Sequence, residues 1–175
     1  MKGAFLFVGA REWQVCPQQQ WAEIAVEAVY KVFPPVKVET WKQCERYLPH
    51  GLVCGELISR YALMFEDAAR LMNSIGVYLE NHALYGMAIP LLEQALKIHV
   101  QVLGEEHPYT ALSLNNLGYL YDGQGRLEEA KLLYKRALAI CIRILGRDHP
   151  NTFVVLNNYV ALLQKMHCDE EATEL

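Results

Sequence analysis

The 175-residue sequence lacks the features of several common classes of protein. No apolar run approaches the roughly 20 residues that a membrane-spanning helix needs. Positive charge is not in excess: the net charge is −4, whereas non-specific binding to nucleic acid or to an anionic membrane requires a basic face. The five cysteines contain no Cys-x-x-Cys pair, and such an odd, scattered set is typical of reduced thiols. We therefore expect a cytoplasmic protein that binds neither nucleic acid nor membrane.

Groupings of residues that would support catalysis are also missing. There is no Gly-x-x-x-x-Gly-Lys-Ser/Thr loop to hold a nucleotide phosphate, and no recognisable Ser-His-Asp arrangement. His107 and His149 each precede a proline, and we expect them to cap helices because a zinc site needs three or four converging ligands. The sequence therefore predicts no catalytic residue, no metal site and no cofactor.

The sequence does contain an internal repeat with a period of 42 residues. The motif Leu-Gly-x-x-His-Pro-x-Thr occupies residues 103–110 and recurs at residues 145–152. The pair Asn115-Asn116 recurs as Asn157-Asn158. Self-similarity at such a period is typical of a solenoid, in which each unit buries its apolar face only against its neighbours. This architecture favours an extended surface for other macromolecules over a pocket for chemistry.

Apolar spacing within the repeats predicts hairpins of two helices. The first pairs residues 66–80 with 85–103, and the second pairs 109–122 with 127–145. A third begins with residues 151–165, and residues 169–175 open a helix that stays incomplete. Left-handed residues are expected to end helices at Gly104 and Gly146, and new helices should begin at Pro108 and Pro150.

Further helices are predicted ahead of the repeats. A helix over residues 21–33 should end at Pro34-Pro35, because proline cannot continue the hydrogen-bond ladder. Its core-facing stripe is expected to contain Trp21, Ile24, Ala25, Ala28, Val29, Val32 and Phe33. Thr40 is predicted to cap a short helix over residues 41–48 that ends at Pro49, and another helix should follow over residues 51–61. Residues 1–20 are predicted as a poorly defined lead-in.

The second unit resembles a tetratricopeptide repeat. The residues that carry the resemblance are Leu114, Leu117, Gly118, Tyr121, Gly125, Leu127, Ala130, Tyr134, Ala137 and Leu138. The long period makes the chain similar to the kinesin-light-chain type of this family. The resemblance implies an all-α, right-handed superhelical solenoid over residues 64–175, with units at about 66–107, 108–149 and 150–175, the last incomplete. The first unit departs with Ala83 at the turn glycine and with Pro90 inside a helix; the third has Val160 and His167 in place of glycines.

Residues 21–63, the N-terminal helical segment, resemble the segment that precedes such repeats in bacterial signal-transduction ATPases of the NB-ARC (STAND) type. The resemblance implies the sensor part of a larger signalling protein.

Similar repeats hold extended peptides on the surface of the first helix of each unit, so we predict a non-enzymatic scaffold that binds a protein or peptide there. The predicted groove residues are Asn73, Val77, Glu80, Asn115, Tyr119, Asp122, Asn157, Ala161 and Gln164. An asparagine amide both donates and accepts, so it can pair with a peptide backbone without reading its sequence. The asparagines could instead tie neighbouring helices together, particularly Asn116 and Asn158. Glu80 and Asp122 could select a basic peptide or form an ordinary solvated face.

Self-association is the alternative function. If the last unit lacks its second helix, an apolar strip should be exposed that invites a second copy. Its predicted residues are Leu156, Tyr159, Leu162 and Leu163.

Overall fold

The computed structural model describes residues 17–167, which are helical and contain no strand. Two helices come first, α1 (Pro17–Val32) and α2 (Trp41–Arg60), with the short 3-10 helix η2 (Val38–Thr40) between them. The repeats follow as α3 (Glu66–Asn81), α4 (Tyr85–Leu103), α5 (Pro108–Gly123), α6 (Leu127–Leu145) and α7 (Pro150–Lys165). The predicted helix boundaries in the repeats are therefore confirmed to within one residue.

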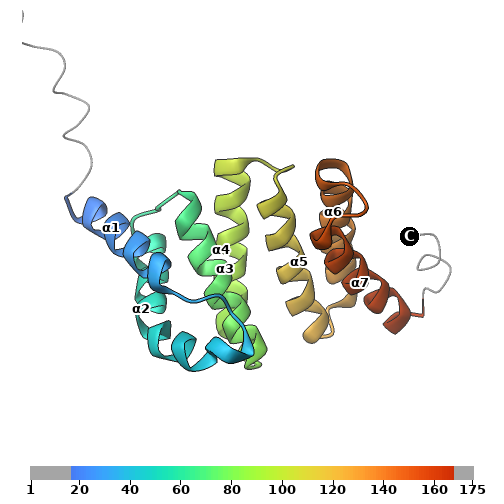
Figure 1. Cartoon of the computed structure of the whole chain (residues 1–175), viewed down its shortest axis with the longest axis horizontal. Helices are drawn as coiled ribbons and strands as arrows, with labels where there is room; N and C mark the ends of the chain where they lie inside the picture. The colour runs from blue at the N-terminus through green and yellow to red at the C-terminus, as the bar shows by residue number, and fades with distance from the viewer. Residues whose placement is uncertain (1–16, 168–175) are drawn as a thin grey trace, which may run out of the picture.

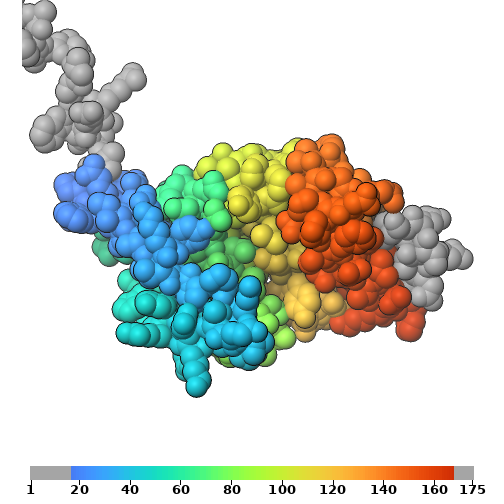
Figure 2. All heavy atoms as spheres, viewed as in Figure 1, coloured from blue at the N-terminus to red at the C-terminus, as the bar shows by residue number. Residues whose placement is uncertain are grey.

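Neighbouring helices form hairpins that stack along the molecule (Figure 1). Helix α3 packs against α4 and α5 packs against α6, while α4 also packs against α5 and α6 against α7. The α1–α2 pair continues this stack, because both helices pack against α3. In the space-filling view the hairpins follow one another from α1 at one end to α7 at the other (Figure 2). The all-α solenoid expected from the repeats is confirmed.

The repeated Leu-Gly-x-x-His-Pro-x-Thr motif builds the turn between units. Gly104 follows α4 with a φ of 94°, a conformation that favours glycine. His107 caps α5, because its Nδ1 atom accepts a hydrogen bond from the Tyr109 N–H at 3.2 Å. The Thr110 hydroxyl donates back to the Gly104 carbonyl at 2.8 Å. The same contacts recur one unit later, so the capping role predicted for both histidines is confirmed.

Small residues lie where the two helices of a unit cross. A Cβ added at Gly76 would lie 2.6 Å from Leu92, and one added at Gly118 would lie 3.2 Å from Tyr134. Ala88 and Ala130, on the facing helices, are fully buried. These positions let the helices approach closely, as the repeat pattern predicts.

The predicted break at Pro49 is wrong. Helix α2 runs through Pro49 without interruption from Trp41 to Arg60. Thr40 does not cap α2 with its side chain; its hydroxyl oxygen instead accepts from the Lys37 N–H at 3.1 Å and thereby closes η2. Pro90 likewise lies inside a continuous α4.

The predicted stripe on the first helix is only partly correct. The buried residues of α1 are Ala22 and Val26, and Phe33 is buried just beyond the helix. Trp21, at 70% exposure, lies in solvent with Ile24 and Val32. Helix α1 is thus apolar on two sides, and only one of them faces the core.

The exposed apolar strip predicted on α7 is also wrong. Tyr159, Leu162 and Leu163 are buried and Leu156 is half-buried against the core. The ring of Tyr159 lies 6.4 Å from that of Tyr134, centroid to centroid, so α6 supplies part of its cover. The helix predicted over residues 169–175 lies outside the described residues.

Candidate functional site

A chain of amide hydrogen bonds crosses the first helices of the three units. Asn158 on α7 donates to Oδ1 of Asn115 on α5 at 3.0 Å. Asn115 donates to its neighbour Asn116 at 3.2 Å, and Asn116 donates to Oδ1 of Asn73 on α3 at 3.1 Å. We call these four residues the asparagine ladder. It ties α3, α5 and α7 together side chain by side chain.

A pocket of about 170 Å³ lies along this ladder. Its lining residues come from α3, α5 and α7, together with Leu92 of α4: Val77, Glu80, Asn81, Leu92, Asn115, Asn116, Tyr119 and Asn158. We call it the asparagine pocket. Each ladder oxygen that accepts one hydrogen bond keeps a second lone pair, so the pocket presents further acceptors to a ligand.

Four of the nine predicted groove residues meet in the asparagine pocket: Val77, Glu80, Asn115 and Tyr119. Tyr119 is 50% exposed, so its ring is available to a ligand. Asn115 is only 4% exposed and belongs to the ladder, so the interpretation that asparagines tie the helices together is confirmed for it. Asn73 lies at the other end of the ladder.

The other predicted groove residues lie outside the pocket lining. Asn157, Ala161 and Gln164 are exposed on α7. Asp122 is engaged within the protein, because its Oδ1 atom lies 2.6 Å from the Lys165 ammonium. Asn81, Asn116 and Asn158 line the pocket but were absent from the predicted groove. The repeat itself could have indicated Asn116 and Asn158, since a residue adjacent to a groove position in one helix can reach across to the next.

Glu80 is the one acidic residue of the asparagine pocket. Its side chain is half-buried, and burial raises the pKa of its carboxyl group because the ionised form loses solvation. A cationic partner would therefore stabilise the ionised form of this carboxyl group.

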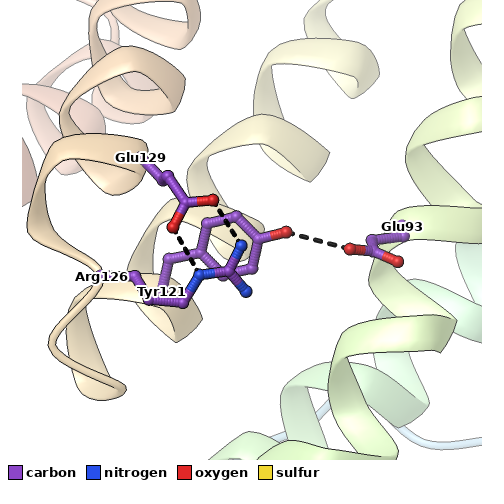
Figure 3. Close-up of polar contacts among 4 residues, drawn as sticks. All are labelled: Glu93, Tyr121, Arg126 and Glu129. Atoms are coloured by element: carbon purple, nitrogen blue, oxygen red, sulfur yellow. Dashed lines mark hydrogen bonds and ion pairs between the residues drawn. The ribbon is translucent and has the colours of Figure 1, made fainter.

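A second polar cluster joins α4 to the second hairpin (Figure 3). The Tyr121 hydroxyl donates to Glu93 on α4 at 2.9 Å, and the Arg126 guanidinium lies 3.7 Å above the centre of the Tyr121 ring. Arg126 also donates twice to the Glu129 carboxylate, at 2.6 and 2.5 Å. Each group thus has a partner within the protein, which is typical of a structural contact.

A buried histidine lies at the junction of α4 and α5. The side chain of His99 is 2% exposed and its Nδ1 atom lies 2.8 Å from the Ser113 hydroxyl, while its Nε2 atom has no hydrogen-bond partner among the described residues. Burial, followed by His107 and Arg70, lowers the pKa of His99 to about 4. The imidazole is therefore neutral at physiological pH.

Within residues 17–167, no group of three or more His, Cys, Asp or Glu side chains is arranged to hold a metal ion. None of the helices described is both long enough and apolar enough to cross a membrane.

The comparison with protein families matches residues 67–142 to the tetratricopeptide repeat. A comparison with curated protein sequences gives no match. Among solved structures, BtubC (BKLC) from P. vanneervenii is similar over 94% of this chain, with a TM-score of 0.72 and 18% identity. This chain spans 64% of the length of that one.

A kinesin-light-chain-like protein of Podosopora anserina with nearly identical TPR-like repeats is also similar. The TM-score is 0.65 and the identity 19%, over 90% of this chain and 69% of the other. At these identities the likeness concerns the fold. Residues 67–142 are therefore similar to the tetratricopeptide repeat, a class of repeat that generally mediates protein–protein interaction, and the fold of the stack is similar to that of kinesin-light-chain-like repeats.

Proposed function

We propose that this chain is a non-enzymatic binding module that holds an extended peptide segment on the surface of α3, α5 and α7. The observation that carries the proposal is the asparagine pocket, in which groups from three successive units converge: the ladder amides, an exposed tyrosine and the Glu80 carboxylate, which has no ion-pair partner among the residues that the structure describes. Amide groups can satisfy the N–H and C=O groups of an extended backbone, and Tyr119 adds apolar contact area together with a hydroxyl.

The surroundings of the pocket support a peptide over a small compact ligand. A pocket of about 170 Å³ is smaller than the roughly 300–1,000 Å³ of typical small-molecule sites. Exposed positions on α7, Asn157, Ala161 and Gln164, extend the surface along the solenoid axis. An elongated ligand could therefore use several units at once.

The proposal also includes a sensing role. The module would report its ligand to a larger cytoplasmic signalling protein, as the resemblance of residues 21–63 suggests. Self-association through α7 is not proposed, because the strip that would carry it is largely buried.

Selection from a random-peptide phage library tests the proposal. The selected peptides should lose about tenfold or more in affinity on Tyr119→Ala, since exposed aromatic side chains commonly dominate such interfaces. Phe153→Ala is the matched control, because Phe153 is also about half exposed but lines a different pocket, between α6 and α7. Peptides that respond to Phe153→Ala and ignore Tyr119→Ala would move the binding site away from the asparagine pocket.

A further inference from the structure

The same acidic position recurs in two successive units but has a partner in only one. Asp122 on α5 pairs with Lys165, the last residue of α7, whose Nζ atom lies 2.6 Å from the Asp122 carboxylate and 3.3 Å from its backbone oxygen. Glu80 on α3 is the equivalent of Asp122, 42 residues earlier. Helix α3 contacts α5 just as α5 contacts α7.

The residue equivalent to Lys165 at the α3–α5 contact is Gly123, which has no side chain. A Cβ at Gly123 would lie 3.5 Å from the Tyr85 ring, an ordinary van der Waals distance. Within residues 17–167, the Glu80 carboxylate has neither a hydrogen bond nor an ion pair. The first unit thus has the acid of this pair without the cation.

The space beside Glu80 suits a compact cation. The asparagine pocket, at about 170 Å³, could hold about five waters or the end of a lysine side chain. A lysine ammonium has three N–H donors; the Glu80 carboxylate can accept one, and the oxygens of Asn115 and Asn116 have free lone pairs for others.

We propose that Glu80 binds the ammonium group of a lysine side chain of a bound peptide, in the position that Lys165 occupies at Asp122. The inference rests on the proposed peptide-binding function and specifies the ligand. It also assigns different roles to two acidic residues at the same repeat position: Asp122 forms an ion pair within the chain, whereas Glu80 binds the ligand.

Binding of selected peptides measures this directly. A random-peptide phage library selected on the full chain should be enriched in lysine at one position. Replacing that lysine with norleucine, which keeps the length and removes the charge, should weaken binding to the wild type about tenfold or more. The same replacement should have little effect on Glu80→Gln, so the two changes are coupled.

Gly123→Lys supplies the missing cation from within the chain. This variant should bind the lysine peptide more weakly than the wild type does and should bind the norleucine analogue with unchanged affinity. Gly123→Met, the uncharged control of similar length, should change the affinity for both peptides equally. In the ligand-free protein, Gly123→Lys should also lower the pKa of Glu80, measured by carbon NMR of its carboxyl group. No change in that pKa would show that a lysine at this position does not reach Glu80, and would overturn the proposed geometry.

The two proposals fail in different ways. Peptides that depend on Tyr119 but show no coupling between Glu80 and a lysine would overturn the lysine assignment alone. Enrichment of arginine instead of lysine in the selected peptides would show that Glu80 binds a cation other than an ammonium group, and would overturn the lysine assignment. Peptides that bind without any dependence on Tyr119, or no selected peptides at all, would overturn the proposed function and this inference together.

Discussion

At the scale of single residues, the turn inside each unit depends on one backbone conformation. Ala83, Gly125 and His167 occupy the same repeat position and have φ values of 57°, 76° and 59°. A left-handed conformation costs a residue with a Cβ roughly 1–2 kcal/mol, a cost that glycine avoids. Ala83 and His167 therefore store local strain that Gly125 does not.

Ala83→Gly should raise the free energy of unfolding by about 0.5–1 kcal/mol, because relief of the strained φ outweighs the greater chain entropy of glycine. Gly125→Ala is the reciprocal change and should lower the free energy of unfolding by about 1–2 kcal/mol. Urea denaturation measures both. A stabilising Gly125→Ala would show that these turns are not strained as described.

His99 makes the stability of the first junction depend on pH. Its pKa is about 4 in the folded chain and about 6.5 when unfolded, so the unfolded state binds more protons between these values. Stability from this group is complete above pH 6.5 and is lost as the pH falls towards 4. Between pH 7 and pH 5 the loss should be about 2 kcal/mol.

The second junction provides the control for this prediction. Cys141 and Val155 occupy the positions of His99 and Ser113 one unit later. The double variant His99→Cys, Ser113→Val should therefore lose about 2 kcal/mol less than the wild type between pH 7 and pH 5, measured by urea denaturation at both pH values. Parallel pH profiles of the two proteins would show that His99 is not the group responsible.

At the scale of helices, close crossing within a unit sets which side chains are tolerated. Gly76→Val should lower the free energy of unfolding by about 1–3 kcal/mol, because its added atoms would overlap Leu92, which is fully buried. Gly86→Ala is the control: nothing lies within 4 Å of its Cβ, and alanine should stabilise α4 by about 0.5 kcal/mol. Equal effects of the two changes in thermal denaturation would contradict the proposed close crossing.

Helix α2 shows how packing overrides a local signal. Proline removes one hydrogen bond from a helix interior and commonly ends or kinks it. Pro49, however, is exposed, so the carbonyl of Glu45 that loses its partner can be hydrated. Buried Cys44 precedes it, and buried Gly51, Cys54 and Ile58 follow on the same stripe. Burial on both sides of the proline thus favours one continuous helix, which the sequence signal alone did not indicate.

At the scale of the whole molecule, the asparagine ladder links the first helices of three successive units through side-chain hydrogen bonds. Asn115→Ala should lower the free energy of unfolding by about 1–3 kcal/mol, because it removes the acceptor of the Asn158 amide N–H and the donor to the Asn116 amide oxygen, both in half-buried side chains. Asn157→Ala, which changes an exposed residue, should stay within about 0.5 kcal/mol of the wild type. Calorimetric unfolding distinguishes them, and equal effects would mean that the ladder contributes nothing to coupling.

Much of the solenoid could be predicted because residues with the same packing role recur at the same position in successive units. Caps at His107 and His149, glycines at the crossings and the turn positions all follow from that pattern. Which face of each end helix is buried could not be predicted in the same way. An apolar pattern shows that a face can be buried, but it does not identify the segment that packs against that face. Trp21 is exposed and Tyr159 is buried for this reason.

The position of the candidate site could be predicted from the sequence, but the hydrogen-bond partners of its side chains could not. Repeat periodicity places Asn115, Tyr119 and Glu80 on one surface, whereas the partner of each amide depends on the offset between neighbouring helices. The two ladder bonds that run between helices join residues 43 apart, one more than the period, so the second asparagine of each pair reaches the first asparagine of the unit before. Asp122 and Lys165 are also 43 residues apart, and the same offset from Glu80 falls on Gly123.

The most direct test of peptide binding on α3, α5 and α7 is an NMR titration of the isotope-labelled chain with a selected peptide. The side-chain amides of Asn116 and Asn158 and the backbone amide of Tyr119 should shift most, while the region of Phe153 stays unchanged. Shifts confined to α2, α4 or α6, with the ladder amides unmoved, would contradict the account.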